Sequence, residues 1–212
     1  MAKMEDVLDL YALAYDESRP VVCVDESPKQ LLADTRKPLL AKPGKPAKQD
    51  HEYKRNGMQE IFICCEPKMG LRHMEVKAQR TAKDFARFMK RIADEFYPHA
   101  DCIRIVLDNL NTHKPGAFYE TFAPNEARRL AKRFEFHYTP KHGSWLNMAE
   151  IELAVLSKVC LDRRIPNAAA LKKEVSAYER KRNQVVASID WRFTTHDARQ
   201  KMRQVYPLNS SG

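Results

Sequence analysis

The chain is 212 residues long and carries 37 lysines and arginines against 28 aspartates and glutamates, a formal net charge of +9. Its 43% hydrophobic and 31% charged residues suit one globular domain and exclude a disordered chain or a fibrous repeat. The longest apolar runs, 61–65 and 103–107, are far shorter than the ~18 residues of a membrane span. The basic excess alone leaves nucleic acid, anionic lipid and simple solubility open.

The first part of the chain predicts a helix, a strand and a long loop. Apolar residues that share one face predict a helical lead-in over 1–19. The β-branched run 21–24 predicts a short buried strand with Asp25 at its carboxyl end. Prolines, glycines and basic residues predict an extended, solvated loop over 35–57.

The rest of the chain alternates strands with helices. Capping residues, apolar runs and helical periodicity predict the following elements: a hairpin of 58–67 and 71–78, a helix from Thr81 to Phe96, a strand over 102–107, one or two helices over 117–134, a strand over 134–138, and helices over 145–163, from Asn167 onward and over 197–205. No repeat or low-complexity linker interrupts this order. It is typical of one compact α/β domain.

The cysteines indicate a reducing environment. They form no C-x-x-C pair, and four of them lie inside apolar runs. We therefore expect buried thiols in a cytoplasmic protein, without disulfides or a zinc site. Early acids and the lack of a continuous apolar stretch near the N-terminus argue against a signal peptide.

Two of the predicted buried strands end in an acid, Asp25 and Asp108. Ligands of α/β sheets collect at the carboxyl ends of strands, so these two carboxylates are candidates for one site, although either could be a simple turn or cap. The helix after the last strand offers Glu150 and Glu152. These two glutamates lie roughly 200° apart on a helix and cannot share a face.

A cluster of three carboxylates is unfavourable unless a cation neutralises it. All-oxygen ligands suit Mg²⁺ or Mn²⁺ rather than zinc. Two such ions would serve phosphodiester chemistry, by activating the attacking oxygen and stabilising the leaving one. The basic charge of the chain would then match a nucleic-acid substrate.

Three motifs carry a family resemblance: VDE at 24–26, LDNLNTH at 107–113 and YTPKHGSWLNMAE at 138–150. KPGKP at 42–46, HEYKRNG at 51–57 and DWRFTT at 190–195 extend the match over almost the whole chain from residue 21. With these motifs the chain resembles the DDE transposases of the IS630 and Tc1/mariner superfamily. The resemblance implies an α/β, RNase H-like fold with a mixed central sheet of about five strands flanked by helices.

The resemblance also implies the domain limits and the site. Residues 1–20 would be a lead-in, 21–165 the catalytic core with its basic loop 35–57, and 166–212 a helical extension of the same domain. Asp25, Asp108 and Glu150 would form the catalytic, metal-binding triad for two Mg²⁺ or Mn²⁺ ions, with Glu152 as the alternative. Four residues would line the site and orient phosphate or water, although turn capping explains them equally well: Asn109, Asn111, His113 and His142.

The partners that the resemblance implies are DNA at transposon ends and at the target. Only about 20 residues precede the first predicted strand, too few for a helix-turn-helix module, so we expect a separate end-binding segment to be needed. A homodimer on DNA is a further expectation, and no membrane partner is expected. The expected location is the bacterial cytoplasm, on the nucleoid when the protein is bound to DNA.

The loop over 35–57 is the strongest candidate for contact with the DNA backbone. Its basic residues, spaced among prolines, could follow a line of phosphates, although a charged run is often only a solvated face. The candidates are Arg36, Lys37, Lys42, Lys45, Lys48, Lys54 and Arg55. Arg180–Arg182 and the basic residues of 128–133 are weaker candidates.

These observations favour an enzyme that cleaves DNA at transposon ends and joins the 3′ end to target DNA. Two alternatives stay open. One is a domesticated or truncated remnant that binds DNA without cutting it, and the other is an RNase H-like nuclease acting on RNA hybrids.

Overall fold

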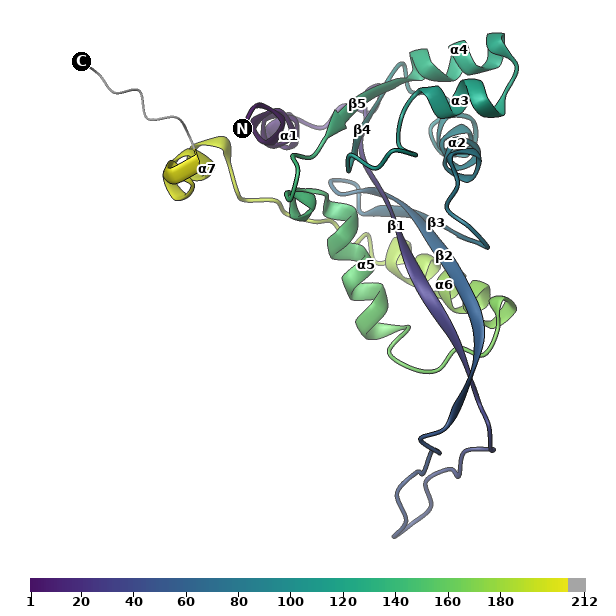
Figure 1. Cartoon of the computed structure of the whole chain (residues 1–212). Coiled ribbons are helices and arrows are strands. Elements are labelled where there is room, and N and C mark those ends of the chain that lie inside the picture. The colour runs from purple at the N-terminus through teal and green to yellow at the C-terminus, as the bar shows by residue number, and fades with distance from the viewer. Residues whose placement is uncertain (206–212) are drawn as a thin grey trace, which may run out of the picture.

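A computed structural model describes residues 1–205 of the chain (Figure 1). Its centre is a five-stranded sheet with the strand order β3-β2-β1-β4-β5. The strands are β1 (Val21–Asp34), β2 (Tyr53–Glu66), β3 (Leu71–Lys77), β4 (Ile103–Leu107) and β5 (Phe134–Tyr138). β1, β4 and β5 are parallel, whereas β2 runs antiparallel to both of its neighbours. The expected mixed sheet of about five strands is confirmed.

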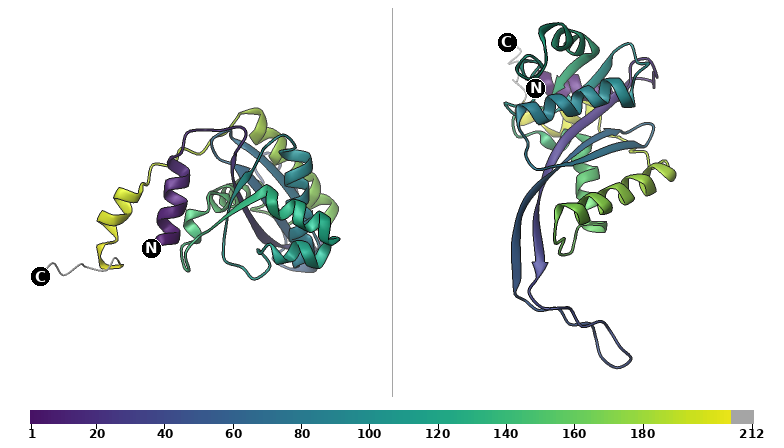
Figure 2. Two further views of the ribbon diagram at one scale, coloured as in Figure 1. Left: turned by 90° about the horizontal axis from the view of Figure 1, so that it is seen from above. Right: turned by 90° about the vertical axis from the view of Figure 1, so that its right-hand side faces the viewer.

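Helices cover both faces of this sheet (Figures 1 and 2). They are α1 (Ala2–Ala12), α2 (Ala82–Arg91) with a π-helical last turn (Ile92–Phe96), α3 (Gly116–Thr121), α4 (Pro124–Arg133), α5 (Met148–Val159), α6 (Ala168–Gln184) and α7 (Thr195–Lys201), with 3₁₀ turns at Ser144–Leu146 and Arg203–Val205. Within residues 1–205, no helix is both long and apolar enough to cross a bilayer.

The alternation of β1 side chains separates two hydrophobic cores. Val22 and Val24 point to one face and pack in a core with Phe85 of α2 and Phe118 of α3. Cys23 points to the other face and packs in a core that α1, α5 and α7 help to form. A third cluster extends this second face between β2, β3, α5 and α6. The same alternation therefore sends Asp25 and Glu26, the next two residues of β1, to opposite faces.

β1 does not end at Asp25, contrary to the prediction. It continues to Asp34 because β2 pairs with it antiparallel along this whole length, with Asp25 opposite Ile63. The parallel pairing with β4 covers only Val21–Cys23, so within the described residues no strand pairs with this edge of β1 beyond that point. A free edge tolerates Pro28, which has no N–H to donate. Asp25 thus lies within β1, just past the end of its pairing with β4.

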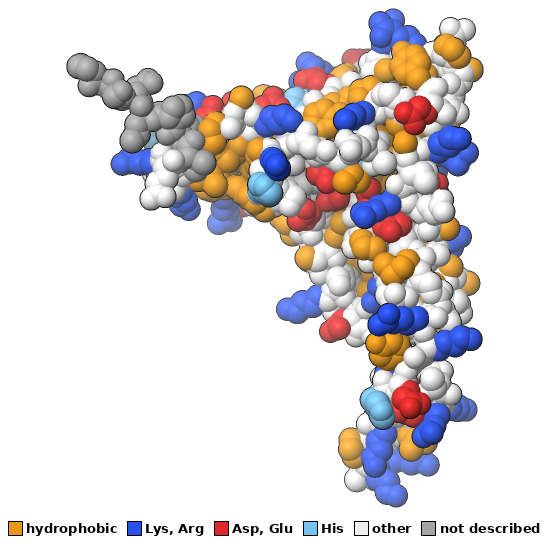
Figure 3. All heavy atoms as spheres, viewed as in Figure 1, with side chains coloured by type: hydrophobic (Ala, Val, Ile, Leu, Met, Phe, Trp, Pro, Cys, Tyr) orange, Lys and Arg blue, Asp and Glu red, His pale blue; other side chains and the backbone are white. Residues whose placement is uncertain are grey.

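The predicted loop is shorter than expected, because residues 53–57 belong to β2. Residues 35–52, named the basic arm below, project from the β1–β2 ribbon as an exposed hairpin (right-hand view of Figure 2). Two isolated bridges, Leu39 with Lys48 and Lys42 with Lys45, hold its sides together, and Gly44 adopts a positive φ of 75° at the tip. Lys and Arg side chains gather at the far end of the arm (Figure 3).

Other boundaries also differ from the predictions. α1 ends at Ala12 rather than near 19, because Asp16 folds the chain into a turn by accepting hydrogen bonds from Ser18. α5 begins at Met148 and ends at Val159. α7 begins at Thr195, two residues earlier than expected. Residues 206–212 of the expected C-terminal extension lie outside the described residues.

The predicted Thr81 cap is confirmed as a capping box with Asp84. All five cysteines are free thiols in the described structure. Cys23, Cys64 and Cys65 are buried, as predicted, whereas Cys102 and Cys160 are only partly buried.

Candidate active site

The three predicted acids line one cleft of about 400 Å³. Asp25 comes from β1, Asp108 follows β4, and Glu150 lies in the first turn of α5. We name this hollow the acidic cleft; its other lining residues are Glu26, Ser27, Arg80, Leu110, Ser144 and Leu153. The strands β1 and β4 are parallel neighbours, which brings the first two acids to the same end of the sheet.

Asp25 is held from two sides. Its Oδ1 accepts a hydrogen bond from the Glu26 N–H at 2.8 Å, and its Oδ2 accepts one from the Asn147 side chain at 3.3 Å. Burial, with the nearby charges of Glu26, Asp108 and Glu150, raises the pKa of Asp25 to about 7. Burial is the larger cause of this shift, and the neighbouring carboxylates add to it.

Asp108 experiences the opposite shift. Its Oδ1 accepts hydrogen bonds from His113 Nδ1 at 2.6 Å and from the Leu110 N–H at 3.1 Å, and the bond with His113 is the main reason that its pKa is lowered. Burial alone would lower the pKa of His113, but its hydrogen bonds with Asp108 and Glu26 raise it to about 9. The positive charge of His113 therefore stabilises ionised Asp108.

Glu152, the alternative to Glu150, is a structural residue. Its side chain is buried and accepts hydrogen bonds from Tyr178 at 2.6 Å and from Arg182 at 2.9 and 3.0 Å. It also forms an ion pair with the buried Arg72 at 2.9 Å. Both carboxylate oxygens of Glu152 thus bond to residues outside the acidic cleft, whereas Glu150 lines that cleft.

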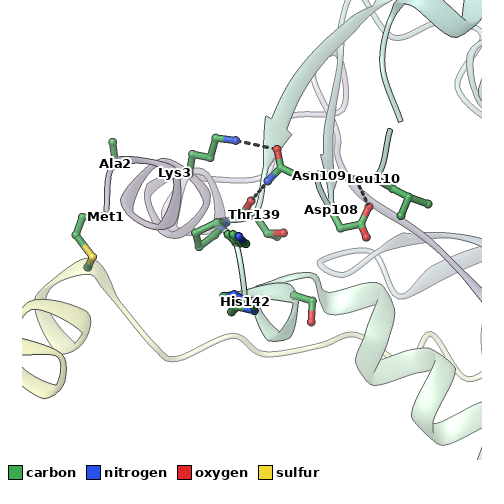
Figure 4. Close-up of a pocket in the computed structure, with 11 residues that line it drawn as sticks. Met1, Ala2, Lys3, Asp108, Asn109, Leu110, Thr139 and His142 are labelled. Carbon is green, nitrogen blue, oxygen red and sulfur yellow. Dashed lines mark hydrogen bonds between the residues drawn. The ribbon is translucent and has the colours of Figure 1, made fainter. Parts of the chain in front are cut away.

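A second hollow of about 830 Å³ adjoins the acidic cleft and shares Asp108, Leu110 and Ser144 with it (Figure 4). We name it the flanking cleft; it is also lined by Met1, Ala2, Lys3, Asn109, Thr139, Pro140, Lys141 and His142. Lys3 donates to Asn109 Oδ1 at 2.8 Å, and the Asn109 amide donates to the Thr139 carbonyl. Lys3 and Lys141 therefore line a cleft that also contains Asp108.

The turn that borders both clefts is tight. The Gly143 N–H donates to the Pro140 carbonyl at 2.9 Å, and a Cβ at position 143 would lie 2.5 Å from Pro140 Cγ. His142 adopts a positive φ of 62°, which is uncommon for a residue other than glycine. This turn brings His142 and Ser144 to the rim of the flanking cleft.

The four residues expected to line the site separate into three groups. Asn109 and His142 line the flanking cleft. Asn111 is exposed and accepts a hydrogen bond from Lys114 at 3.2 Å, without lining either cleft. His113 lines neither cleft, because its side chain is only 1% exposed and is hydrogen-bonded to Asp108 from the inner side.

Two residues of the site were not identified from the sequence. Asn147 caps α5 and contacts β1, and an asparagine directly before a helix is a recognisable capping signal. Arg80 follows β3 and lines the acidic cleft without a hydrogen bond or ion pair to any described residue. No sequence pattern distinguishes it from other surface arginines.

The acids have the chemistry of a site for hard divalent cations, since carboxylate oxygens are the ligands that Mg²⁺ and Mn²⁺ prefer. Asp25, Asp108 and Glu150 bring three carboxylates to one cleft, and a cation would offset the repulsion between them. The side chains are not drawn together, however: among residues 1–205, no three His, Cys, Asp or Glu side chains are close enough to hold one ion. The cleft therefore fits a cation in its residue types and charge, but is more open than a closed coordination site.

Comparison with known proteins identifies the fold and the family. No curated protein matches the chain. Among solved structures, the Mos1 mariner paired-end complex with Mn matches with a TM-score of 0.58 and 14% identity, over 88% of this chain and 55% of that one. The Mos1 strand transfer complex gives a TM-score of 0.60 and 13% identity, over 88% and 54%. The pre-cleavage Mos1 transpososome gives 0.54 and 13%, over 90% and 62%.

The chain thus spans little more than half the length of these structures, and at such low identity the similarity concerns the fold. It confirms the RNase H-like architecture of the sheet and its helices. The model of one family, described as DDE superfamily endonuclease, matches residues 20–172, a segment that contains Asp25, Asp108 and Glu150. The chain belongs to the DDE superfamily endonuclease family.

Proposed function

We propose that this chain is the catalytic domain of a DNA transposase, which cleaves DNA at the ends of a mobile element and joins the freed 3′ end to target DNA. The observation that carries the proposal is the meeting of Asp25, Asp108 and Glu150 in one cleft of a DDE endonuclease fold. The fold is similar to that of Mos1 in a paired-end complex and in a strand transfer complex, which supports this class of reaction.

In this proposal Asp25, Asp108 and Glu150 hold two Mg²⁺ or Mn²⁺ ions. When bound, such ions make a water or a 3′-hydroxyl more nucleophilic and stabilise the charge on the phosphate. The contact with His113 lowers the pKa of Asp108, whereas burial raises the pKa of Asp25 to about 7, so the proton competes with a cation for Asp25 near neutral pH. The two aspartates thus differ in how readily they become ligands.

The DNA backbone would lie across both clefts. Arg80 lines the acidic cleft and makes no hydrogen bond or ion pair with another residue of 1–205, so its guanidinium can contact a phosphate. Lys3 and Lys141 line the flanking cleft, next to Asp108, and are exposed. The basic arm would contact DNA further away. These contacts are with phosphates, so they position the strand without reading its sequence.

Recognition of specific ends belongs in this proposal to a separate helix-turn-helix segment, and a homodimer would hold two ends together. The chain covers only 55% of the Mos1 chain in the paired-end complex, which supports a contribution from further segments. The domain would act on DNA in the bacterial cytoplasm.

The test is an assay of plasmid nicking and of 3′-end joining with Mg²⁺, Mn²⁺ or EDTA. We expect metal-dependent cleavage that Asp108→Asn abolishes and that Glu120→Gln retains, because Glu120 is an exposed residue of α3 that lines neither cleft. Cleavage by Asp108→Asn at the parental rate would refute the proposal. DNA binding without cleavage would favour the inactive remnant, and preferential cleavage of an RNA–DNA hybrid would favour the nuclease.

A further inference from the structure

His113 lies between two carboxylates, on the face of the sheet that α2 and α3 cover. Its Nδ1 is 2.6 Å from Asp108 Oδ1, and its Nε2 is 3.0 and 3.1 Å from the two oxygens of Glu26. The side chains of His113 and Glu26 are 1% and 3% exposed. The ring also packs against Phe85 of α2, with 4.7 Å between ring centroids. The imidazole is therefore held at both nitrogens and on one face.

The backbone around His113 is fixed as well. Its N–H donates to the Leu110 carbonyl at 3.0 Å, and its carbonyl accepts from the Tyr138 hydroxyl at 2.8 Å. The Leu110 N–H in turn donates to Asp108 Oδ1. Two later residues of the segment 108–113 thus hydrogen-bond to the side chain of Asp108. Tyr138 of β5 holds the segment in place through its hydrogen bond to the His113 carbonyl.

The two carboxylate oxygens of Asp108 differ in their hydrogen bonds. Oδ1 accepts from both His113 and the Leu110 N–H, whereas Oδ2 has no hydrogen-bond partner within the described part of the chain. The Asp108 side chain is 33% exposed, although His113 behind it is buried. Oδ2 is therefore the oxygen that is free to take a ligand from the acidic cleft.

We propose that Glu26 and His113 are positioning residues, which fix the Asp108 carboxylate so that Oδ2 alone is presented to a divalent cation. Glu26 holds the ring of His113, and His113 holds Oδ1 of Asp108. The inference rests on the proposed function, because it assigns how one acid of that site is oriented. It also gives the two adjacent acids of β1 separate tasks: Asp25 is a ligand, and Glu26, at the edge of the cleft with a side chain only 3% exposed, holds His113.

Partners that orient metal ligands in this way typically change metal affinity or activity 10- to 100-fold when they are removed. If the pair of Glu26 and His113 only stabilised the fold, its removal would lower the stability but leave the cation affinity of the folded protein unchanged. The measurement that separates the two possibilities is therefore cation binding by the folded chain, with DNA binding as an independent readout.

The experiment titrates the whole chain with Mn²⁺ by calorimetry, with and without a DNA duplex. His113→Phe keeps a ring against Phe85 but removes both nitrogens, and we expect it to weaken Mn²⁺ binding 10- to 100-fold at unchanged DNA affinity. His113→Asn places an amide nitrogen close to the position of Nδ1, so we expect it to recover part of that loss. Glu120→Gln is the isosteric control and should bind Mn²⁺ like the parent.

A double-mutant cycle tests whether the two residues act as one chain of contacts. Glu26→Gln alone should also weaken Mn²⁺ binding, and the double variant with His113→Phe should lose no more than His113→Phe alone. Circular dichroism and melting verify that each variant is folded. If His113→Phe does not fold, His113→Asn and Glu26→Gln decide the question, since the first keeps a polar side chain and the second keeps the size of the glutamate.

The outcomes separate this inference from the proposed function. If Asp108→Asn abolishes Mn²⁺ binding but the folded Glu26 and His113 variants bind like the parent, the positioning role is refuted and the proposed function stands. If the losses of Mn²⁺ affinity in the two single variants simply add in the double variant, Glu26 and His113 act independently, and the proposed chain of contacts is refuted. If the parent itself binds no Mn²⁺ with or without DNA, both proposals fail.

Discussion

Asn147 connects the segments that carry Asp25 and Glu150. Its side-chain oxygen accepts from the Ala149 N–H at 3.2 Å and so caps α5, while its side-chain nitrogen donates to the Val24 carbonyl at 2.9 Å and to Asp25 at 3.3 Å. The residue is fully buried. One amide thus sets where the helix with Glu150 begins relative to the strand with Asp25.

Asn147→Ala should therefore impair both stability and cleavage. Loss of a cap and of a buried hydrogen bond is expected to lower the free energy of unfolding by about 1–3 kcal/mol, and displacement of Glu150 to reduce nicking more than about tenfold. Urea unfolding and plasmid nicking measure the two effects. Asn167→Ala is the matched control, because Asn167 caps α6 on the surface. It should lose about 1 kcal/mol and keep parental nicking; equal nicking by both variants would contradict this account.

Glu150→Gln and Glu152→Gln should have opposite consequences. Glu152 neutralises the fully buried Arg72, so its replacement is expected to destabilise the fold by about 3–5 kcal/mol. Glu150 lines the acidic cleft, so its replacement should abolish nicking and leave the unfolding midpoint nearly unchanged. Chemical denaturation of the two variants, read beside nicking, makes the comparison. A Glu152→Gln variant as stable as the parent would show that the buried pair is dispensable.

Stability without metal should fall between about pH 4 and pH 7. Asp25 has a pKa of about 7 in the folded chain, against roughly 3.9 when unfolded. In this interval the folded chain keeps a proton that the unfolded chain has released, so the free energy of unfolding falls by up to about 1.4 kcal/mol per pH unit and levels off above pH 7. Asp25→Asn should remove this contribution.

Urea unfolding in EDTA from pH 5 to pH 8 tests the effect. The difference between the parent and Asp25→Asn isolates Asp25 from the other titrating groups. Because a cation competes with the proton, Mn²⁺ affinity of the parent should rise up to about tenfold per pH unit below pH 7. Identical pH profiles for the parent and Asp25→Asn would rule out this assignment.

Arg80, Lys3 and Lys141 should matter for DNA affinity rather than for the fold. Each is exposed, so Arg80→Ala and the pair Lys3→Ala with Lys141→Ala should melt like the parent. Each lost phosphate contact should weaken binding and reduce the slope of log affinity against log salt by about 0.9. Fluorescence anisotropy at several salt concentrations measures both. Lys173→Ala, on α6, is the control, and parental slopes in both Arg80→Ala and the Lys3 and Lys141 double variant would place the DNA elsewhere.

The basic arm should also bind phosphates without supporting the domain. Replacing Lys42, Lys45 and Lys48 by glutamine is expected to leave the melting temperature unchanged, because all three side chains are exposed. DNA affinity and its salt dependence should decrease. The control replaces three exposed lysines of the helices, Lys83, Lys132 and Lys172, and so removes the same charge. If both triple variants lose affinity equally, only net charge matters and the arm has no special contact.

The sequence was sufficient for the arrangement of the site but not for its inner contacts. Continuous apolar strands followed by acids predicted that Asp25 and Asp108 meet at one end of the sheet, and they do line one cleft. The choice of Glu150 over Glu152 depended on the motif, since helical geometry shows only that the two point apart. The burial of Glu152 depends on Arg72 and Arg182, residues remote in sequence.

The length of β1 and the orientation of His113 also depend on contacts between residues remote in sequence, so the sequence did not predict them. Pro28 is typical of a turn, and it is tolerated inside β1 because β4 no longer pairs with the strand beyond Cys23. His113 belongs to a polar motif that suggested contact with substrate, whereas its ring is turned inward by Glu26. Local patterns identify which residues matter, but contacts between distant segments determine what each one faces.

The order of the sheet has a consequence for biosynthesis. β1 and β4 pair through Val21–Cys23 and Arg104–Val106, and Glu150 follows later still on α5. Contacts between segments so distant in the chain form slowly, because the intervening loop must close first. A growing chain therefore has no complete acidic cleft until α5 has left the ribosome and docked. Under the proposed function, DNA cleavage would be confined to molecules whose synthesis has passed that point.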